Sequence, residues 1–280
     1  MKDDVHGETH VKAGTALLKA DRQTRILEVL QESQESMRIS SLSQLLNVAP
    51  VTIRRDVQEL ARQGMVLSRH GGVTVLRPHV TFEPGYQVKL TEEAQVKDAL
   101  ARLAVGLVEE GGTIFLDGGT TVGAMVRYLV NRHVTVVSNA LNVANVLARS
   151  RSIRLILIGG AFRPESQTFL GTRAVRQLQD LRFDVAFMGA EGFDVHQGLE
   201  VPDEADAEFK TMAAKSASQV VVMASGSKCG QRRLYRFAEW KDVQVLVTTP
   251  VEGVDVIGAL RNHGTRVMEA IGPRASPPEA

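Results

Sequence analysis

Residues 51–76 read VTIRRDVQELARQGMVLSRHGGVTVL, and their hydrophobic period changes halfway along. In the first half Ile53, Val57 and Leu60 recur at helical spacing, which places them on one face, and Gly64 ends the pattern. In the second half apolar and polar residues alternate on both sides of two glycines, as in a β-hairpin with a glycine turn. The stretch therefore predicts a helix followed by a small two-stranded wing.

Two more helices are expected before this stretch. Ile26, Leu27 and Leu30 form an apolar stripe within a first helix at about residues 21–34, and a second short helix fits residues 41–46. Pro50 suits the first position of the third helix, where no backbone N–H is needed, so that helix runs to about residue 62. Two short helices joined by a tight turn form a helix-turn-helix, whose second helix enters the major groove of DNA by its leading end.

The leading end of the third helix and the tip of the hairpin carry side chains that suit contact with DNA. Residues 54–77 contain five arginines and two acids, a local net charge of +3, whereas the whole chain has a net charge of +1. This local excess suits phosphate contacts. The alternative interpretation is a small helical interaction module with a solvated arginine face. The expected DNA contacts are Val51, Thr52, Arg54 and Arg55 on the helix, and Arg69 and His70 at the hairpin tip.

The whole chain has 280 residues, of which 44% are hydrophobic, so two domains are expected. The single cysteine, Cys229, excludes an internal disulfide, and no signal peptide or apolar run of membrane-spanning length is evident. These features favour a cytoplasmic protein that does not enter a membrane. We expect no cofactor. We also expect no metal: His6 and His10 have the spacing of metal ligands, but they lie in a polar extension.

Changes in the pattern divide the chain into five ranges. Polar residues 1–18 and 272–280 predict a disordered extension and a tail. Residues 19–77 form the winged helix-turn-helix domain, and residues 91–271 form a larger domain. Residues 78–90 are expected to be a linker, because prolines and a glycine interrupt regular structure there.

The larger domain contains six runs rich in Val, Ile and Leu that end in small or polar residues. Most of them precede a helical segment, as in a mainly parallel sheet with helices on both faces, so the domain is predicted to be α/β. Ligands of such sheets bind beyond the carboxyl ends of the strands. The runs are 113–117, 134–140, 153–160, 184–192, 219–228 and 244–249. The side chains and glycines expected to meet in one pocket there are Asp117, Gly118, Gly119, Thr120, Thr121, Ser138, Asn139, Gly159, Gly160 and Lys228.

The loop at residues 117–121, DGGTT, joins a strand to a helical segment. Its glycines let the backbone approach a ligand, its hydroxyls donate hydrogen bonds, and a helix N-terminus favours negative charge, so the loop suits a phosphate. Asp117 would repel a phosphate, and we expect it to accept hydrogen bonds from sugar hydroxyls or to fix the loop. A plain turn remains the alternative for the loop, and a solvated lysine the alternative for Lys228.

A helix is also expected after Asp203. The acidic residues in its first turn interact favourably with the helix dipole, and the simplest interpretation places Lys210 on the solvent face of the helix.

Both halves of the chain resemble one family, the DeoR-type transcription repressors. In the first half TIRRD, then EL, a glycine and HGG resemble the family's helix-turn-helix signature. In the second half the similar elements are DGGTT, Ser138-Asn139, Gly159-Gly160, GAEG at 189–192, Gly198-Leu199, Glu204-Ala205 and Ser227-Lys228. The resemblance covers about residues 21–249.

This resemblance implies a second half that senses a phosphorylated sugar and is similar in fold to sugar-phosphate isomerases and deaminases. It also adds Lys89, Lys97 and Glu204 to the expected ligand-binding residues. Two departures bear on specificity. Ala49 and Pro50 stand where the family commonly has a serine, which affects base preference. Ser225 stands where the family often has Asp, and the loss of that carboxylate is expected either to change which sugar is accepted or to weaken the response to the inducer.

The sequence therefore predicts a repressor of a carbohydrate-utilisation operon that a phosphorylated sugar releases from double-stranded operator DNA. A homo-oligomer, either a dimer or a tetramer, is expected to hold two winged helices on operator half-sites. One alternative is a DNA-binding protein whose second half only oligomerises. Another is a sugar-phosphate enzyme, for which Asp117, Asp203 and Glu204 are candidate bases, but the attached DNA-binding module argues against catalysis.

Overall fold

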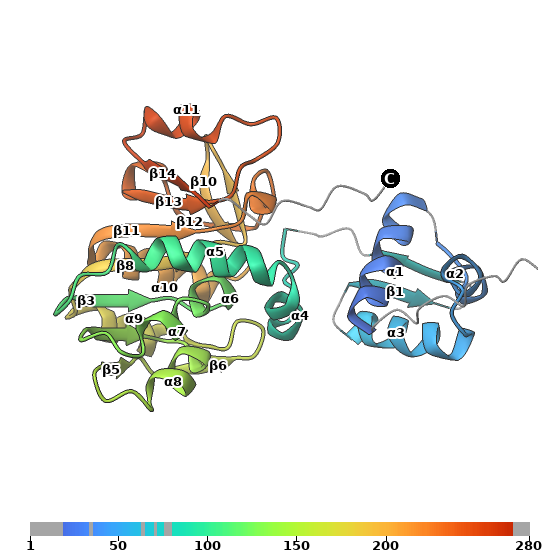
Figure 1. The fold of residues 1–280 in the computed structure, drawn as a ribbon, viewed down its shortest axis with the longest axis horizontal. Helices are drawn as coiled ribbons and strands as arrows, with labels where there is room; N and C mark the ends of the chain where they lie inside the picture. The colour runs from blue at the N-terminus through green and yellow to red at the C-terminus, as the bar shows by residue number, and fades with distance from the viewer. Residues whose placement is uncertain (1–18, 34–35, 63–64, 70–71, 76–79, 271–280) are drawn as a thin grey trace, which may run out of the picture. The chain divides into compact units, whose positions relative to one another are not determined.

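The computed structural model describes residues 19–33, 36–62, 65–69, 72–75 and 80–270. The chain divides into two compact units between Arg77 and Pro78, and each unit has its own hydrophobic core (Figure 1). The extension and tail expected at residues 1–18 and 272–280 lie outside the described residues, as does His70. No helix in the described ranges is long and apolar enough to cross a membrane.

The first unit has three helices followed by an antiparallel hairpin, as the sequence predicts. Helix α1 spans Lys19–Ser33, α2 Ile39–Leu46 and α3 Pro50–Arg62, and strands β1 (Val66–Arg69) and β2 (Gly72–Val75) form the hairpin. Helices α1 and α2 each begin two residues earlier than expected. The core consists of the buried apolar residues Ile26, Leu30, Leu42, Ile53, Val57, Leu60, Val66 and Val73, which come from all three helices and both strands.

The turn between α2 and α3 is held by its own backbone and one hydroxyl. Asn47 ends α2 in the left-handed conformation, with φ of 50°, which asparagine tolerates better than most residues. The Ser43 hydroxyl donates to the Val48 carbonyl at 2.6 Å. Pro50 begins α3, where a missing N–H costs nothing. The turn therefore needs no serine at position 49.

The second unit is built on a parallel seven-stranded sheet with the order β14-β13-β11-β8-β3-β4-β5. All six expected strands are present, although most are shorter than their apolar runs, and β14 at the edge was not expected. Alternate side chains point to opposite faces, so Phe115 and Ile114 join different cores. The strands are β3 (Thr113–Leu116), β4 (Thr135–Ser138), β5 (Arg154–Leu157), β8 (Phe183–Gly189), β11 (Ala217–Met223), β13 (Val245–Thr248) and β14 (Arg266–Glu269).

Helices cover both faces of this sheet, which confirms the predicted α/β architecture (Figure 1). One core includes side chains of α5 (Ala94–Val105), α6 (Thr120–Gly123), α7 (Val126–Leu129) and α8 (Leu141–Leu147). The other includes side chains of α9 (Thr172–Gln179), α10 (Glu204–Lys215) and α11 (Val256–Arg261). A fully parallel sheet needs such cover, because its central strands are apolar on both sides.

Two small antiparallel sheets were not expected. Strands β6 (Ala161–Arg163) and β7 (Thr168–Leu170) form a hairpin, and a three-stranded sheet joins β9 (Gly192–Asp194), β10 (Gly198–Val201) and β12 (Tyr235–Ala238). Each strand has only three or four residues, so it is too short for a hydrophobic period to reveal it.

The structure corrects the linker expected at residues 78–90. Residues Tyr86–Thr91 form helix α4, with Gly85 as its N-cap, so the glycine that was taken as an interruption begins a helix. Glu83 and Lys89 are buried within the second unit rather than solvated. Their ion pair explains why these two charged side chains are buried, and the sequence pattern alone does not reveal that pair.

Candidate functional site

The first candidate site is the leading end of α3, and we call Val51, Thr52, Arg54 and Arg55 the reading face. Val51 is 58% exposed and both arginines are exposed, whereas the apolar face of the same helix is buried in the core. The 3.6-residue period of the helix produces this separation. The four residues therefore lie where the sequence predicted, on the outer side of the second helix of a helix-turn-helix.

Charge pairing within the first unit leaves the positive charge of the reading face uncompensated. The two acids of α3 are held by basic residues of α1: Arg22 bonds to Asp56 at 2.5 Å, and Lys19 bonds to Glu59 at 2.7 Å. Arg54 and Arg55 form no ion pair with any residue in the described part of the chain. Helix α3 therefore presents arginines outward while its acids face α1.

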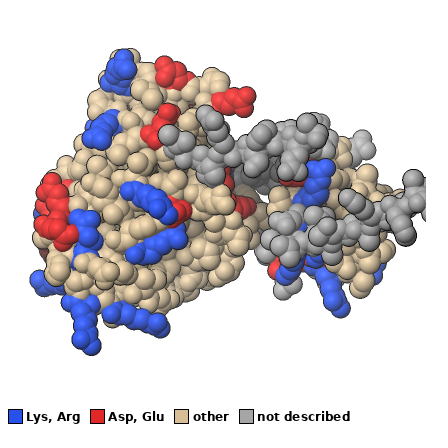
Figure 2. Space-filling model, in the orientation of Figure 1, with Lys and Arg blue, Asp and Glu red and all other residues tan. Residues whose placement is uncertain are grey.

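Two more basic residues of this unit lie outside α3, at the end of β1 and directly before α2. Arg69 ends β1 opposite Gly72, and only its backbone is described. Arg38, directly before α2, is exposed and was not among the expected DNA contacts. A basic residue just before the first helix of the helix-turn-helix was the signal for it in the sequence. Blue side chains of Lys and Arg stand on the surface of this unit in Figure 2.

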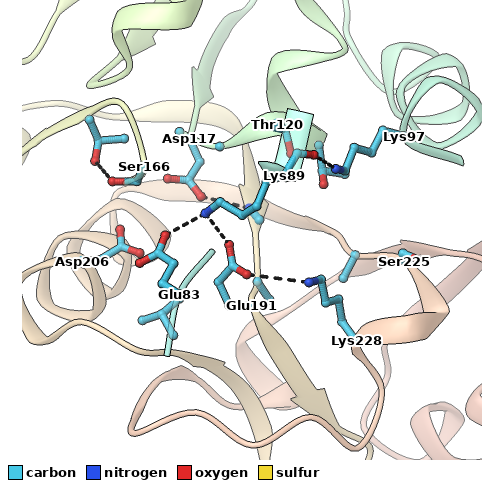
Figure 3. Close-up of a pocket in the computed structure, with 18 of the residues that line it drawn as sticks. Glu83, Lys89, Lys97, Asp117, Thr120, Ser166, Glu191, Asp206, Ser225 and Lys228 are labelled. Atoms are coloured by element: carbon cyan, nitrogen blue, oxygen red, sulfur yellow. Dashed lines mark hydrogen bonds and ion pairs between the residues drawn. The ribbon is translucent and has the colours of Figure 1, made fainter. Parts of the chain in front are cut away.

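The second candidate site is a pocket at the carboxyl ends of the central strands β3, β8 and β11, where ligands of parallel sheets are expected (Figure 3). Segment 83–97, which includes α4 and the start of α5, and strand β7 add to its walls. Its lining residues are Glu83, Lys89, Glu92, Glu93, Lys97, Asp117, Gly118, Gly119, Thr120, Thr121, Ser166, Thr168, Gly189, Ala190, Glu191, Val201, Asp206, Lys210, Ala224, Ser225 and Lys228.

The loop after β3 forms one wall of the pocket and depends on both of its glycines. Gly119 has φ of 91°, a conformation that side chains rarely adopt. A Cβ atom on Gly118 would lie 2.0 Å from the Thr168 side chain. The amide of Asn142 donates to the Gly119 carbonyl at 3.2 Å and holds the loop from α8.

Asp117 fixes this loop through a buried ion pair with Lys210. One carboxylate oxygen, Oδ2, accepts from the Lys210 ammonium and from the Gly189 backbone N–H at 2.9 Å. Burial alone would lower the pKa of Lys210, but the charge of Asp117 outweighs it and raises that pKa. Lys210 is only 5% exposed, so the expectation that it lies on a solvent face was wrong. The other oxygen of Asp117, Oδ1, is buried with no hydrogen-bond partner.

Lys89 stands at the centre of the pocket between two carboxylates. Its ammonium bonds to Glu83 at 2.7 Å and to Glu191 at 2.8 Å, and Glu83 also bonds to Arg163 at 2.7 Å. Burial alone would lower the pKa of Lys89, but the charges of Glu191 and Glu83 raise it instead. Burial would raise the pKa of Glu191, but the charges of Lys89 and Lys228 lower it to about 2. Lys89 and Glu191 are therefore both charged at neutral pH.

Two further lysines face the pocket without a close carboxylate bond. Lys97 donates to the backbone carbonyls of Lys89 and, at 2.7 Å, Glu92. Burial lowers the pKa of Lys97, and the like charge of Lys228 lowers it further. Lys228 lies 3.8 Å from Glu191, beyond hydrogen-bond distance. Lys97 has no ion pair with the described residues and Lys228 has only this long one, so the two ammonium groups are suited to bind an added anion.

Ser225 borders the same side of the pocket and contacts a carboxylate from another element. Its hydroxyl donates to one oxygen of Glu93 at 3.1 Å, and Ser227 donates to the other oxygen at 3.1 Å. Glu93 precedes α5 in the left-handed conformation, with φ of 49°. The segment between α4 and α5 thus brings a carboxylate to the residue that follows β11.

The pocket brings together eight of the expected ligand-binding positions. These are Lys89, Lys97, Asp117, Gly118, Gly119, Thr120, Thr121 and Lys228. Five others do not line it, and their expected convergence on this pocket is corrected: Ser138, Asn139, Gly159, Gly160 and Glu204.

Each of the five has a local structural reason for its position. Ser138 accepts from the Ala140 N–H, and Asn139 donates to the Phe169 carbonyl, although Oδ1 of Asn139 is buried without a hydrogen-bond partner. The two glycines follow β5 at the edge of the sheet, away from the central strands, and a Cβ on Gly160 would lie 2.4 Å from the Leu170 carbonyl. Glu204 is exposed at the start of α10.

Several lining residues were not expected from the sequence. Asp206 lies two positions after Glu204, on the side of α10 that faces the pocket, and it is 8% exposed. Glu191 sits within the GAEG element, which was recognised without a role for its acid. Glu83 fell in the expected linker. Ser166 and Thr168 belong to the β6–β7 hairpin, for which no sequence signal was seen.

Comparison with protein families identifies this two-unit chain. Residues 22–79 match the DeoR-like helix-turn-helix domain, and residues 92–249, more than half of the chain, match the DeoR C terminal sensor domain. The chain therefore belongs to the DeoR family of DNA-binding transcription regulators, and its second unit is a sensor domain for a small-molecule effector.

Similar proteins of known sequence are transcription regulators. A putative aga operon transcriptional repressor of Escherichia coli O157:H7 is 29% identical over 95% of this chain and 97% of that protein. A lactose phosphotransferase system repressor of Staphylococcus epidermidis is 30% identical over 82% of this chain and 92% of that protein. The relatives are regulators, so the expectation that this chain is not an enzyme is confirmed.

Similarity to solved structures is weaker. Ribose 5-phosphate isomerase A from Methanocaldococcus jannaschii matches with a TM-score of 0.36 and 20% identity, covering 49% of this chain and 55% of that one. The full-length sorbitol operon regulator SorC from Klebsiella pneumoniae matches with a TM-score of 0.32 and 14% identity, covering 76% and 90%. Likeness at this level carries no conclusion about ligands.

Proposed function

We propose that this regulator represses a carbohydrate-utilisation operon and is released from its operator by a phosphorylated sugar bound in the pocket. The observation that carries the proposal is the pair Lys97 and Lys228 beside a loop of glycines and threonines: Lys97 has no ion pair with the described residues, and Lys228 has only a long one, 3.8 Å from Glu191. Exposed backbone N–H groups, threonine hydroxyls and ammonium groups are the usual partners of a phosphate.

The other charges of the pocket are consistent with this assignment. Lys89 and Lys210 are bonded to carboxylates and neutralise them, so they add little attraction for a new anion. Lys228 lies far enough from Glu191 to turn toward a ligand. The names of two relatives, an aga operon repressor and a lactose phosphotransferase system repressor, support a target gene set for carbohydrate use.

The proposed mechanism couples the two units by a shift of population. An assembly of two or four chains holds two reading faces on the half-sites of the operator, and each arginine neutralises a DNA phosphate or contacts a base edge. The sugar phosphate binds one conformation of the sensor unit more tightly, and this conformation has the lower affinity for DNA. Release requires only this difference in affinity.

The test measures binding to the DNA upstream of the regulator's own gene by fluorescence anisotropy, while a panel of hexose and pentose phosphates is titrated in. One phosphosugar is expected to weaken DNA binding, and Thr120→Ala or Lys97→Met should raise the concentration needed. Glu204→Gln, an exposed residue outside the pocket, is the control. If no phosphosugar changes the anisotropy of the complex, the effector proposal is wrong, and a sensor unit that only oligomerises explains the data better.

A further inference from the structure

Two buried carboxyl groups in the pocket have hydrogen-bonding capacity that the described residues leave unused. Oδ1 of Asp117 is buried and accepts no hydrogen bond, although Asp117 itself is only 1% exposed. Asp206 is 8% exposed, and its carboxyl group forms no hydrogen bond or ion pair with the residues that the structure describes. Leaving such groups buried and unpaired is costly, so unpaired polar atoms in a pocket mark positions that a ligand satisfies.

These two carboxyl groups lie away from the lysines proposed to bind phosphate. Figure 3 shows Asp117, Asp206 and Ser166 on one side of the pocket, and Lys97, Ser225 and Lys228 on the other. Lys89, with its bonds to Glu83 and Glu191, stands between the two sides. We call the first group the carboxyl side and the second the ammonium side. A ligand that fills the pocket therefore meets different chemistry at its two ends.

The chemistry of the carboxyl side selects the groups that can bind there. A phosphate carries a charge of about −1.5 to −2 at neutral pH and is repelled by carboxylates, so this side disfavours it. An apolar group would leave both carboxyls unpaired. A hydroxyl donates one hydrogen bond and accepts others, so it satisfies Asp117 Oδ1 and can exchange hydrogen bonds with Asp206 in either protonation state.

We infer that Asp206, acting with Oδ1 of Asp117, is the specificity-determining residue of the pocket and binds hydroxyl groups of the ligand at the end opposite its phosphate. The inference deepens the proposed function and rests on it. It defines the effector as a polyhydroxylated phosphate ester, in which free hydroxyls remain several carbons from the phosphate.

The protonation of Asp206 supports this assignment. Burial raises its pKa, the charge of Lys210 opposes the rise, and the charges of Asp117 and Glu83 add to it, so the pKa reaches about 7. Near neutral pH Asp206 therefore carries a proton part of the time and can donate to a hydroxyl oxygen, while Oδ1 of Asp117 is placed to accept. A donor beside an acceptor suits two adjacent hydroxyls of one carbon chain.

The experiment uses isothermal titration calorimetry on the full-length protein. The probes are inorganic phosphate and the phosphosugar that binds the wild type most tightly in a panel of hexose, pentose and alditol phosphates. The variants are Asp206→Leu, which removes hydrogen bonding, and Asp206→Asn, which keeps a donor and an acceptor but no charge. Glu204→Leu is the matched control, an exposed acid two residues earlier on the same helix. Thermal unfolding of each variant verifies folding.

The expected pattern separates the two sides of the pocket. Asp206→Leu should weaken phosphosugar binding about tenfold or more, since hydroxyl-reading sites discriminate strongly, while inorganic phosphate affinity changes less than about twofold. Asp206→Asn should lose clearly less than Asp206→Leu. Lys97→Met, on the ammonium side, should weaken both probes.

Three results would overturn the inference. Unchanged phosphosugar binding in Asp206→Leu would remove Asp206 from recognition. An equal loss for both probes would mean that the variant damages the pocket generally. A loss in Asp206→Asn as large as in Asp206→Leu would indicate that the carboxyl side binds a cationic amino group instead. If the folded wild type binds inorganic phosphate but no phosphosugar, the proposed function itself fails, and this pattern differs from all three.

Discussion

The reading face and the pocket both carry basic side chains, but they hold them in opposite ways. Arg54 and Arg55 are exposed and form no ion pair with described residues, whereas Lys89 and Lys210 are buried and bonded to carboxylates. DNA is a long polyanion that many exposed charges can contact, and the released counterions drive binding. A small ligand offers one anionic group, so its site must be fixed beforehand. Basic side chains in the first unit are therefore available to attract DNA, whereas those buried in the sensor unit hold the pocket in shape.

The largest effect is expected where a buried pair is broken. Lys210→Met leaves Asp117 buried and uncompensated, and such changes destabilise a fold by about 3–5 kcal/mol. Urea denaturation followed by circular dichroism measures the loss, and the double variant Lys210→Met/Asp117→Asn should recover much of it because both charges are removed. A Lys210→Met variant as stable as the wild type would contradict the architectural role of this lysine.

The next effect is on DNA affinity. Replacing both Arg54 and Arg55 by Ala should weaken binding to promoter DNA by about 100-fold and reduce the slope of log affinity against log salt by about 2, as expected when two phosphate contacts are lost. Anisotropy titrations at several salt concentrations measure both quantities. Arg261→Ala, which removes one exposed arginine on α11 of the sensor unit, serves as the control for loss of positive charge far from α3 in the sequence. An unchanged salt slope would exclude phosphate contact by these arginines.

A smaller effect tests the border of the ammonium side. Ser225→Asp places a second carboxylate beside Glu93, which now accepts from Ser225 and Ser227. The added negative charge should repel a phosphate and weaken phosphosugar binding by about tenfold. Ser225→Ala, which removes only the hydroxyl, should change the affinity much less in the same calorimetric titration. Tighter binding by the Asp variant would show that residue 225 forms hydrogen bonds with the ligand, rather than acting through the electrostatic potential around the lysines.

The smallest effect is on the pH dependence of stability. An unfolded chain releases the Asp206 proton near the ordinary pKa of 3.8, whereas the folded unit keeps it to about 7. Between these values the folded state holds more protons, so this group makes the unit less stable as pH rises through the window. Asp206→Asn removes the dependence, so the melting temperature of this variant should rise relative to that of the wild type as the pH is raised from 4 to 8. A constant difference would contradict the raised pKa.

The sequence predicted which side of α3 is exposed because the residues concerned are neighbours on one helix. The period of Ile53, Val57 and Leu60 fixes which side of α3 is buried, and the positions between them follow. The sequence also predicted the sheet and the loop at Asp117, since each depends on a short continuous run. Such features require no knowledge of long-range pairing.

The remainder of the pocket depends on pairing between distant residues. The sequence around Lys210 indicates a solvent-facing lysine, because its partner Asp117 is 93 positions away along the chain. Asp206 and Glu204 differ by two positions on one helix, and only the direction in which α10 packs decides which of them faces the pocket. Ser138 and Asn139 follow a strand as expected, but the order of the sheet places β4 beside the central strands rather than among them.

The position of segment 80–97 in the chain has a consequence for how a signal leaves the pocket. Val80 and Glu83 are among the first described residues after the division of the chain, and they are anchored to the sensor unit by Leu234 and Arg163. The tether to the DNA-binding unit and the wall of the pocket are thus one continuous stretch of backbone. Substitutions that separate ligand binding from DNA release are therefore expected within this stretch, rather than in the cores on either face of the sheet.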